Sequence, residues 1–298
     1  MPHTYTNGIV TFYEDASPSG PGPFPAVVLI HGHSVDLRMW QYQVPALLEA
    51  SAASGSASGG GFRVVRYDVR GHGRSMVPPD GYTWENYAAD LGDLLDRINV
   101  DRPASESLAL DAAHVVGLSM GGGIALQFAL DFPKRVLSLT LVDPALPGFT
   151  YSKDFSDRIQ ALVQAVQVEG VWPAFRNHWL NHPLFDGLRS RPEAFALLQE
   201  MVRGFQAPEY RGLPTAPEGY RQPQIAERLA EIAAPTLVIA GEDDLPDFRL
   251  IADLLAENIT GARQAVLPGC GHVPPMEDPD AFNATLIGFL CEVSPAPT

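Results

Sequence analysis

The chain has 298 residues, of which 46% are hydrophobic and 18% charged, a composition typical of a globular protein rather than a disordered or fibrous one. Its 35 Asp and Glu side chains against 20 Lys and Arg give a formal net charge of −15, which would repel nucleic-acid phosphates and anionic membrane surfaces. We therefore expect neither nucleic acid nor a membrane as a partner.

The features that report on cellular compartment agree with one another. The two cysteines, Cys270 and Cys291, have no CxxC spacing and are too few for a disulfide framework. The first ten residues, MPHTYTNGIV, lack the basic and then apolar pattern of a secretory signal. The longest apolar window, residues 115–130, is shorter than the roughly 20 residues that span a bilayer. These features favour a cytoplasmic protein.

Short apolar runs rich in β-branched residues recur along the chain, with amphipathic segments between them. The predicted strands are AVVLIHG from residue 26, RVVRYD from 63, HVVGLS from 114, VLSLTLVD from 136, TLVIAGED from 236 and ARQAVLPG from 262. The predicted helices span residues 37–50, 83–98, 120–132 and 278–290. This alternation predicts an α/β fold with a doubly wound, mostly parallel sheet.

Two segments interrupt the alternation. Residues 51–61, SAASGSASGGG, have the composition of a flexible surface loop. From residue 146 the strand pattern stops, and the sequence becomes helical and aromatic, with four prolines in an irregular stretch at 207–224. We expect residues 146–231 to form a helical cap inserted into a core of residues 1–145 and 232–298.

One serine stands in the turn between an apolar strand and a helix. In GLSMG, Ser119 is flanked by Gly117 and Gly121, a G-x-S-x-G pattern whose tight turn strains the central residue and leaves no room for flanking side chains. Such a pattern also occurs in ordinary turns. Its place at a strand-to-helix junction makes Ser119 a candidate nucleophile.

A serine hydroxyl needs a base to attack, so a histidine oriented by a carboxylate should project from loops at the carboxyl ends of strands. His272 lies between the last predicted strand and the last predicted helix, and is the candidate base. The candidate acids follow the preceding strand: Glu242, Asp243, Asp244 and Asp247. Spacing alone does not choose among them, and one of the adjacent aspartates could instead cap the following helix.

Backbone amides must stabilise the oxyanion of such a reaction. The run LIHGHS is a strand followed by a sharp turn, and Met120 opens the helix after the candidate nucleophile, so the N–H groups of His33 and Met120 are candidate donors. The acids near the last strands lack metal-ligand spacing such as H-x-x-x-H. We expect no metal and no cofactor.

Five stretches carry a family resemblance: LIHGHS, RYDVRGHGRS, GLSMGGGIALQFALDFPKRVLSLTLVDPA, PTLVIAGEDD and LPGCGHVPPMEDPDAFN. In this order and spacing, the chain resembles the α/β-hydrolase fold superfamily over almost its whole length. The resemblance implies a catalytic triad of Ser119, Asp244 and His272, with Asp243 and then Asp143 as alternative acids.

The resemblance also bears on residues outside the triad. It implies structural roles for His72 and Arg74 of GHGRS. Superfamily dehalogenases and epoxide hydrolases use an aspartate nucleophile, so a serine indicates acyl chemistry instead. Carbon–carbon hydrolases commonly carry a tryptophan directly after the catalytic histidine, where this chain has Val273 and Pro274, which weakens that alternative.

The chain is also similar to bacterial carboxylesterases and enol-lactonases. We therefore expect a carboxylesterase that hydrolyses a small or medium apolar ester. A lactonase or a carbon–carbon hydrolase is the alternative, and a ligand receptor is the non-enzymatic alternative. Four aromatic residues of the cap could line the acyl pocket or simply pack the cap: Trp172, Phe175, Trp179 and Phe205. Three arginines could bind a substrate carboxylate or lie on the surface: Arg176, Arg203 and Arg211.

Overall fold

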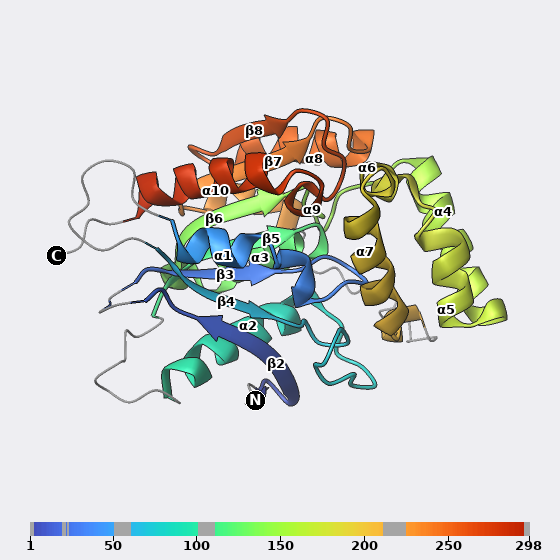
Figure 1. Cartoon of the computed structure of the whole chain (residues 1–298), viewed down its shortest axis with the longest axis horizontal. Helices are drawn as coiled ribbons and strands as arrows, with labels where there is room; N and C mark the ends of the chain where they lie inside the picture. The colour runs from blue at the N-terminus through green and yellow to red at the C-terminus, as the bar shows by residue number, and fades with distance from the viewer. Residues whose placement is uncertain are drawn as a thin grey trace.

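The computed structural model describes residues 3–19, 22, 24–50, 61–100, 111–210 and 225–294, and Figure 1 shows their arrangement. Eight strands form one sheet in the order β1-β2-β4-β3-β5-β6-β7-β8. The six strands that the sequence predicts are all present and mutually parallel: β3 (Ala26–Ile30), β4 (Arg63–Tyr67), β5 (Ala113–Leu118), β6 (Val136–Val142), β7 (Thr236–Gly241) and β8 (Arg263–Leu267). The predicted α/β class is confirmed.

Two antiparallel strands at the sheet edge were not predicted. β1 (His3–Thr6) and β2 (Ile9–Ala16) form a hairpin, and β2 also pairs with β4. The hairpin turns at Asn7 and Gly8, whose φ angles of 40° and 83° are both positive. A two-residue hairpin turn of type I′ requires positive φ at both central residues, and Asn-Gly is a pair that favours it.

Helices cover both faces of the sheet (Figure 1). On one face α1 (Gln43–Leu48) packs against α10 (Pro279–Val293), and on the other α2 (Trp84–Val100) packs against α3 (Met120–Asp131). α8 (Pro246–Asn258) packs on β7. Every residue of β3, β5 and β7 is buried between these layers. The helix predicted at 37–50 is in fact a 3₁₀ turn, Leu37–Trp40, followed by α1.

A helical segment follows β6 and returns to β7. It contains α4 (Lys153–Glu169), α5 (Val171–Ala174), α6 (Asp186–Arg189) and α7 (Pro192–Gly204), and Figure 1 shows it beside the carboxyl ends of the parallel strands. We call it the α4–α7 segment; it includes the π-helical turn Phe175–Trp179 and the 3₁₀ turn Pro208–Tyr210.

The remaining short elements are α9 (Pro274–Glu277) and the 3₁₀ turns Pro133–Arg135, Pro183–Phe185, Ile225–Glu227 and Leu229–Glu231. The turn Pro208–Tyr210 corrects the expectation of irregular chain from 207 onward, whereas residues 211–224 and the glycine-serine loop at 51–60 lie outside the described residues. Within the described ranges, no helix is both long enough and apolar enough to cross a membrane.

Candidate active site

Ser119 occupies the sharp turn between β5 and α3. Its φ of 54° and ψ of −116° are strained for a residue with a side chain. The two flanking glycines permit the turn, because a Cβ on Gly121 would lie 2.2 Å from the carbonyl oxygen of Ile30, and one on Gly117 would lie 2.1 Å from the carbonyl oxygen of Gly121. The turn therefore raises the serine hydroxyl at the carboxyl end of the sheet.

Ser119, His272 and Asp244 form a hydrogen-bonded chain. The Ser119 hydroxyl lies 3.0 Å from Nε2 of His272, and Nδ1 of His272 lies 2.8 Å from Oδ2 of Asp244. Since a carboxylate only accepts, Nδ1–H is the donor, which leaves Nε2 free to accept the proton of the serine. His272 and Asp244 are 3% and 5% exposed, so solvent competes little for either bond.

The other acids near β7 face elsewhere. Glu242 and Asp243 are exposed. Asp247 instead accepts hydrogen bonds from the backbone amide and the hydroxyl of Ser152, each 2.7 Å long, at the start of α4. The possibility that one of the adjacent aspartates caps α8 is wrong, because its N-cap is Leu245 and has no side-chain hydrogen bond.

Asp143, at the end of β6, lies behind the triad acid. It accepts a 3.0 Å hydrogen bond from the amide of Gly241. Burial raises the pKa of Asp143 well above its usual range, and the adjacent charge and hydrogen bond of Asp244 raise that pKa further. This shift favours the neutral form of Asp143, in which its carboxyl group could donate a hydrogen bond to Asp244.

These same groups are the metal-ligand cluster found among the described residues. One ligand atom from each of Asp143, Asp244 and His272 lies within 4.8 Å of the others. The hydrogen bond between His272 and Asp244, and that from Gly241 to Asp143, engage the atoms that would coordinate an ion. The arrangement suits a carboxylate that orients the imidazole better than it suits metal binding.

The loop after β3 passes directly beside the serine. A Cβ on Gly32 would lie 2.9 Å from Cδ2 of Leu118 and 3.5 Å from Cβ of Ser119, so a larger residue here would require the Leu118 side chain to shift. His33 follows Gly32, and Met120 is the first residue of α3, where an amide has no acceptor within the helix. Both sequence-predicted oxyanion donors therefore lie next to Ser119.

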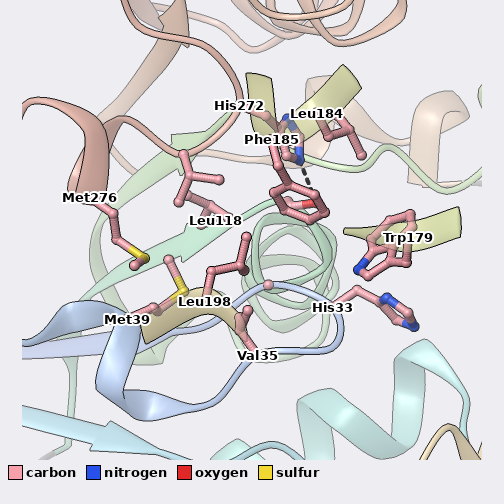
Figure 2. A pocket seen from close by; sticks show the side chains of 13 residues that line it. His33, Val35, Met39, Leu118, Trp179, Leu184, Phe185, Leu198, His272 and Met276 are labelled. Carbon is pink, nitrogen blue, oxygen red and sulfur yellow. Dashed lines mark hydrogen bonds between the residues drawn. The ribbon is translucent and has the colours of Figure 1, made fainter. Parts of the chain in front are cut away.

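A cavity opens between the triad and the α4–α7 segment (Figure 2). It encloses about 400 Å³ of empty space, including the part open to solvent. Apart from Gly32, His33, Ser119 and His272, its lining is apolar: Val35, Met39, Leu118, Trp179, Leu184, Phe185, Leu198, Val273 and Met276. Most of these residues were not predicted, because the sequence does not show which side chains of the α4–α7 segment face the sheet.

Of the four aromatic residues expected to line the pocket, only Trp179 does so. Phe175 and Phe205 are buried and pack their rings around His33, with ring centroids 6.2 and 5.1 Å from its imidazole. Trp172 is half-buried beneath the guanidinium of Arg203, 5.6 Å above its ring. These three residues pack the α4–α7 segment together instead of facing the cavity.

A family model described as the alpha/beta hydrolase fold matches residues 25–279. The chain belongs to the alpha/beta hydrolase family. Known members resemble this hydrolase over nearly its full length. A protein of Variovorax paradoxus (strain S110) named as a carbamate hydrolase is 32% identical over 281 residues, which cover 92% of this chain and 95% of that protein.

Two further relatives are named for the hydrolysis of different bonds. The 3-oxoadipate enol-lactonase 1 of Acinetobacter baylyi (strain ATCC 33305 / BD413 / ADP1) is 28% identical, over 91% of each chain. The solved structure of a thermophilic esterase from Thermogutta terrifontis is 26% identical with a TM-score of 0.74, and the match covers 98% of this hydrolase and 97% of the esterase. The relatives thus share a fold with several hydrolytic activities.

The cationic residues considered for a substrate carboxylate do not face the cavity of this hydrolase. Arg176 and Arg203 are exposed on the α4–α7 segment, and Arg211 lies outside the described residues. Among the residues described, the cavity lining contains no lysine or arginine. Two basic residues of the GHGRS stretch also lie elsewhere: His72 stacks on Phe205 with ring centroids 4.6 Å apart, and the guanidinium of Arg74 lies over Phe12.

Glu277 of α9 is a site residue that sequence reasoning missed. It accepts hydrogen bonds from the amides of Gly271 and Val273, 2.7 and 2.9 Å long, which flank His272 in the chain. Arg191 of the α4–α7 segment lies 3.6 Å away and supplies a counter-charge. The signal available in the sequence was an acid five residues after the candidate base.

Proposed function

We propose that this hydrolase cleaves carboxylic esters with a small or medium, uncharged apolar acyl group, through an acyl-enzyme on Ser119. The observation that carries the proposal is the hydrogen-bonded chain from Ser119 through His272 to Asp244, whose Ser119 and His272 line an apolar cavity. The first feature suits acyl transfer and the second suits an apolar substrate.

Acylation begins when the Ser119 oxygen attacks the carbonyl carbon of the ester and its proton passes to Nε2 of His272. Asp244 keeps the imidazole oriented and stabilises the positive charge that forms on it. The tetrahedral oxyanion accepts hydrogen bonds from the amides of His33 and Met120. The intermediate then collapses, the ester C–O bond breaks, and the leaving alkoxide takes the proton from His272.

Deacylation repeats these steps with water as the nucleophile. His272 removes a proton from the water, whose oxygen attacks the acyl carbon, and the Ser119 oxygen leaves with the proton that His272 returns. The reaction needs no group beyond the side chains, the two amides and water. Asp143, held neutral behind Asp244, adds no second negative charge to the site.

The cavity supports the choice of acyl group. Its lining is apolar except at Gly32, His33, Ser119 and His272, which is the kind of lining that binds small apolar groups. A substrate carboxylate placed there would lose its hydration without gaining a cationic partner from the described lining, which is unfavourable. Neutral apolar acyl groups are therefore favoured over the acid-bearing lactones that the sequence left open. We further propose that residues 146–231 act as a cap that encloses the substrate above a core of residues 1–145 and 232–298.

The test is a panel of p-nitrophenyl esters of increasing acyl length, with a neutral lactone and a half-ester of a dicarboxylic acid, assayed beside Ser119→Ala. We expect turnover of the neutral esters, weak turnover of the charged half-ester, and loss of both in the variant. Lactone turnover without ester turnover would replace the proposal with a lactonase. Ligand-induced stabilisation without repeated turnover of any substrate would indicate a receptor, and activity retained by Ser119→Ala would overturn the mechanism.

A further inference from the structure

The imidazole of His33 extends from the loop after β3 into the α4–α7 segment. Its Nε2 lies 2.7 Å from Oε1 of Glu209 and 3.4 Å from the hydroxyl of Tyr210. Rings from the segment surround the imidazole at centroid distances between 5.1 and 6.2 Å: Phe175, Trp179, Phe205 and Tyr210. His33, whose amide is the proposed oxyanion donor, is thus held through its side chain by the α4–α7 segment.

The next residue of the loop has a second link to the same segment. Ser34 is fully buried and has a φ of 63°, a left-handed conformation that is strained for serine. Its hydroxyl accepts a 2.6 Å hydrogen bond from the indole N–H of Trp179, and Figure 2 shows the indole nitrogen turned toward this loop. A strained backbone persists only where its surroundings hold it, and Trp179 provides one such constraint.

Glu209 is a charged partner in a largely covered position. Its side chain is 26% exposed and that of His33 is 19% exposed. Burial by itself would raise the pKa of Glu209, but the hydrogen bond and the charge of His33 outweigh it and lower that pKa. A charge-assisted hydrogen bond in such a setting is stronger and more directional than one on an open surface.

We propose that Glu209 is a positioning residue, which acts through His33 to hold the oxyanion-binding amide against Ser119. The inference rests on the proposed function, since it assumes that the His33 amide stabilises the oxyanion. The oxyanion-binding site would then depend on the α4–α7 segment. Ser119 and His272 come from the loops of the sheet, whereas two contacts with the segment, His33–Glu209 and Ser34–Trp179, set the position of the His33 amide.

The loss of Glu209 should destabilise the transition state more than it weakens substrate binding. The amide interacts mainly with the negative charge that develops during the reaction, so its displacement lowers kcat with little change in KM. Removing an oxyanion donor outright lowers kcat about 100- to 1,000-fold in a well-studied protease. For an amide that is displaced and not deleted, we expect a fall of about 10- to 100-fold in Glu209→Ala.

The experiment compares Glu209→Ala, Glu209→Gln and Glu193→Ala with the wild type. Glu193 is an exposed glutamate at the start of α7 and serves as the matched control. We expect Glu209→Ala to lower kcat on the best p-nitrophenyl ester while KM stays within about twofold. Glu209→Gln, which keeps an acceptor for His33, should recover most of the activity, and Glu193→Ala should match the wild type. Thermal unfolding shows whether each variant is folded.

A second readout does not depend on ester turnover. An alkyl trifluoromethyl ketone forms a tetrahedral adduct with an active serine, and its affinity reports on the oxyanion hole. The corresponding secondary alcohol reports only on the apolar cavity. We expect Glu209→Ala to lower the affinity for the ketone by about the same factor as it lowers kcat, and to leave the affinity for the alcohol unchanged. Equal ketone affinity in wild type and Glu209→Ala would overturn this inference alone, whereas no adduct in the wild type would overturn the proposed nucleophile and this inference with it.

Discussion

Glu277 holds His272 in place without touching its imidazole. The two carboxylate oxygens of Glu277 accept hydrogen bonds from the amides on either side of His272, and the Glu277 side chain is completely buried. Gly187 packs against this carboxylate so closely that a Cβ there would lie within 1.9 Å of Oε2. The loop that presents the base is therefore fixed from α9 beneath it and from the α4–α7 segment above.

We predict that Glu277→Gln damages both stability and activity. An amide group at this position replaces one acceptor with a donor that faces a backbone N–H, so at least one buried amide loses its partner. Such a loss costs about 1–3 kcal/mol, and the released His272 loop should lower kcat by about tenfold or more, because small displacements of a catalytic base are costly. Urea unfolding and ester kinetics measure the two effects. Glu257→Gln, at an exposed site on α8, is the control, and unchanged values in Glu277→Gln would contradict the assignment.

Much of the fold was predictable because its central strands are wholly buried. β3 and β7 contain only buried residues, so they appear in the sequence as unbroken apolar runs. β2 is half-exposed and pairs near the sheet edge. Its mixture of polar and apolar residues does not form an apolar run, so it was not predicted, although Asn7 and Gly8 indicate the turn before it. Apolar runs in the sequence therefore predict the central strands of this sheet more readily than its edge strands.

The parts of the site that rest on local geometry were also predictable. The glycines around Ser119 are needed by the turn itself, and His272 follows a strand. The choice of Asp244 over Asp243 depended on which side chain faces the imidazole, and the resemblance rather than spacing supplied it. Glu209 was not predicted because it binds His33 from 176 residues away, and no local sequence pattern indicates a contact between the α4–α7 segment and the loop after β3.

Asp143 and Asp244 should respond differently to replacement by asparagine. Asp143→Asn should change kcat less than about fivefold at neutral pH, because an asparagine mimics the protonated acid that donates to Asp244. Asp244→Asn should lower kcat by about 10⁴-fold, as removal of the charge that orients the base does in serine proteases.

The double variant tests the coupling between these two acids. In Asp244→Asn, Asp143 no longer faces a negative charge, so its pKa should fall and residual activity should rise with pH as it ionises. Adding Asp143→Asn should abolish that pH dependence. The kcat of the four proteins between pH 5 and 9 provides the measurement, and a large defect in Asp143→Asn alone would show that this acid is ionised in the wild type.

His114 should make the stability of the protein sensitive to acid. Burial lowers the pKa of His114 to about 4, and its ring nitrogens hydrogen-bond to the hydroxyls of Ser138 and Ser294. Because the folded-state pKa lies below the ordinary value of 6.5, the unfolded state binds the proton more readily. The stability contributed by neutral His114 is complete above pH 6.5 and is lost as the pH falls toward 4.

Comparison with His114→Gln isolates this contribution from those of other titrating groups. The stability advantage of the wild type over His114→Gln should shrink by up to about 3 kcal/mol between pH 7 and pH 4. Urea unfolding at pH steps across this range measures it. A constant difference between the two proteins would mean that His114 titrates alike in the folded and unfolded chains.

The size of the acyl group should be set where α7 faces the cavity. Leu198 of α7 lines the cavity near Met39 (Figure 2), so Leu198→Trp should fill part of the space without touching the triad. We expect acetate esters to retain their kcat/KM within about threefold, while esters with longer acyl chains lose about tenfold or more, since about 0.8 kcal/mol of favourable burial is lost for each excluded methylene. Gln199→Trp adds the same ring to an exposed position of α7 and should leave the acyl-length profile unchanged. A uniform loss across all chain lengths in Leu198→Trp would place the acyl group outside this cavity.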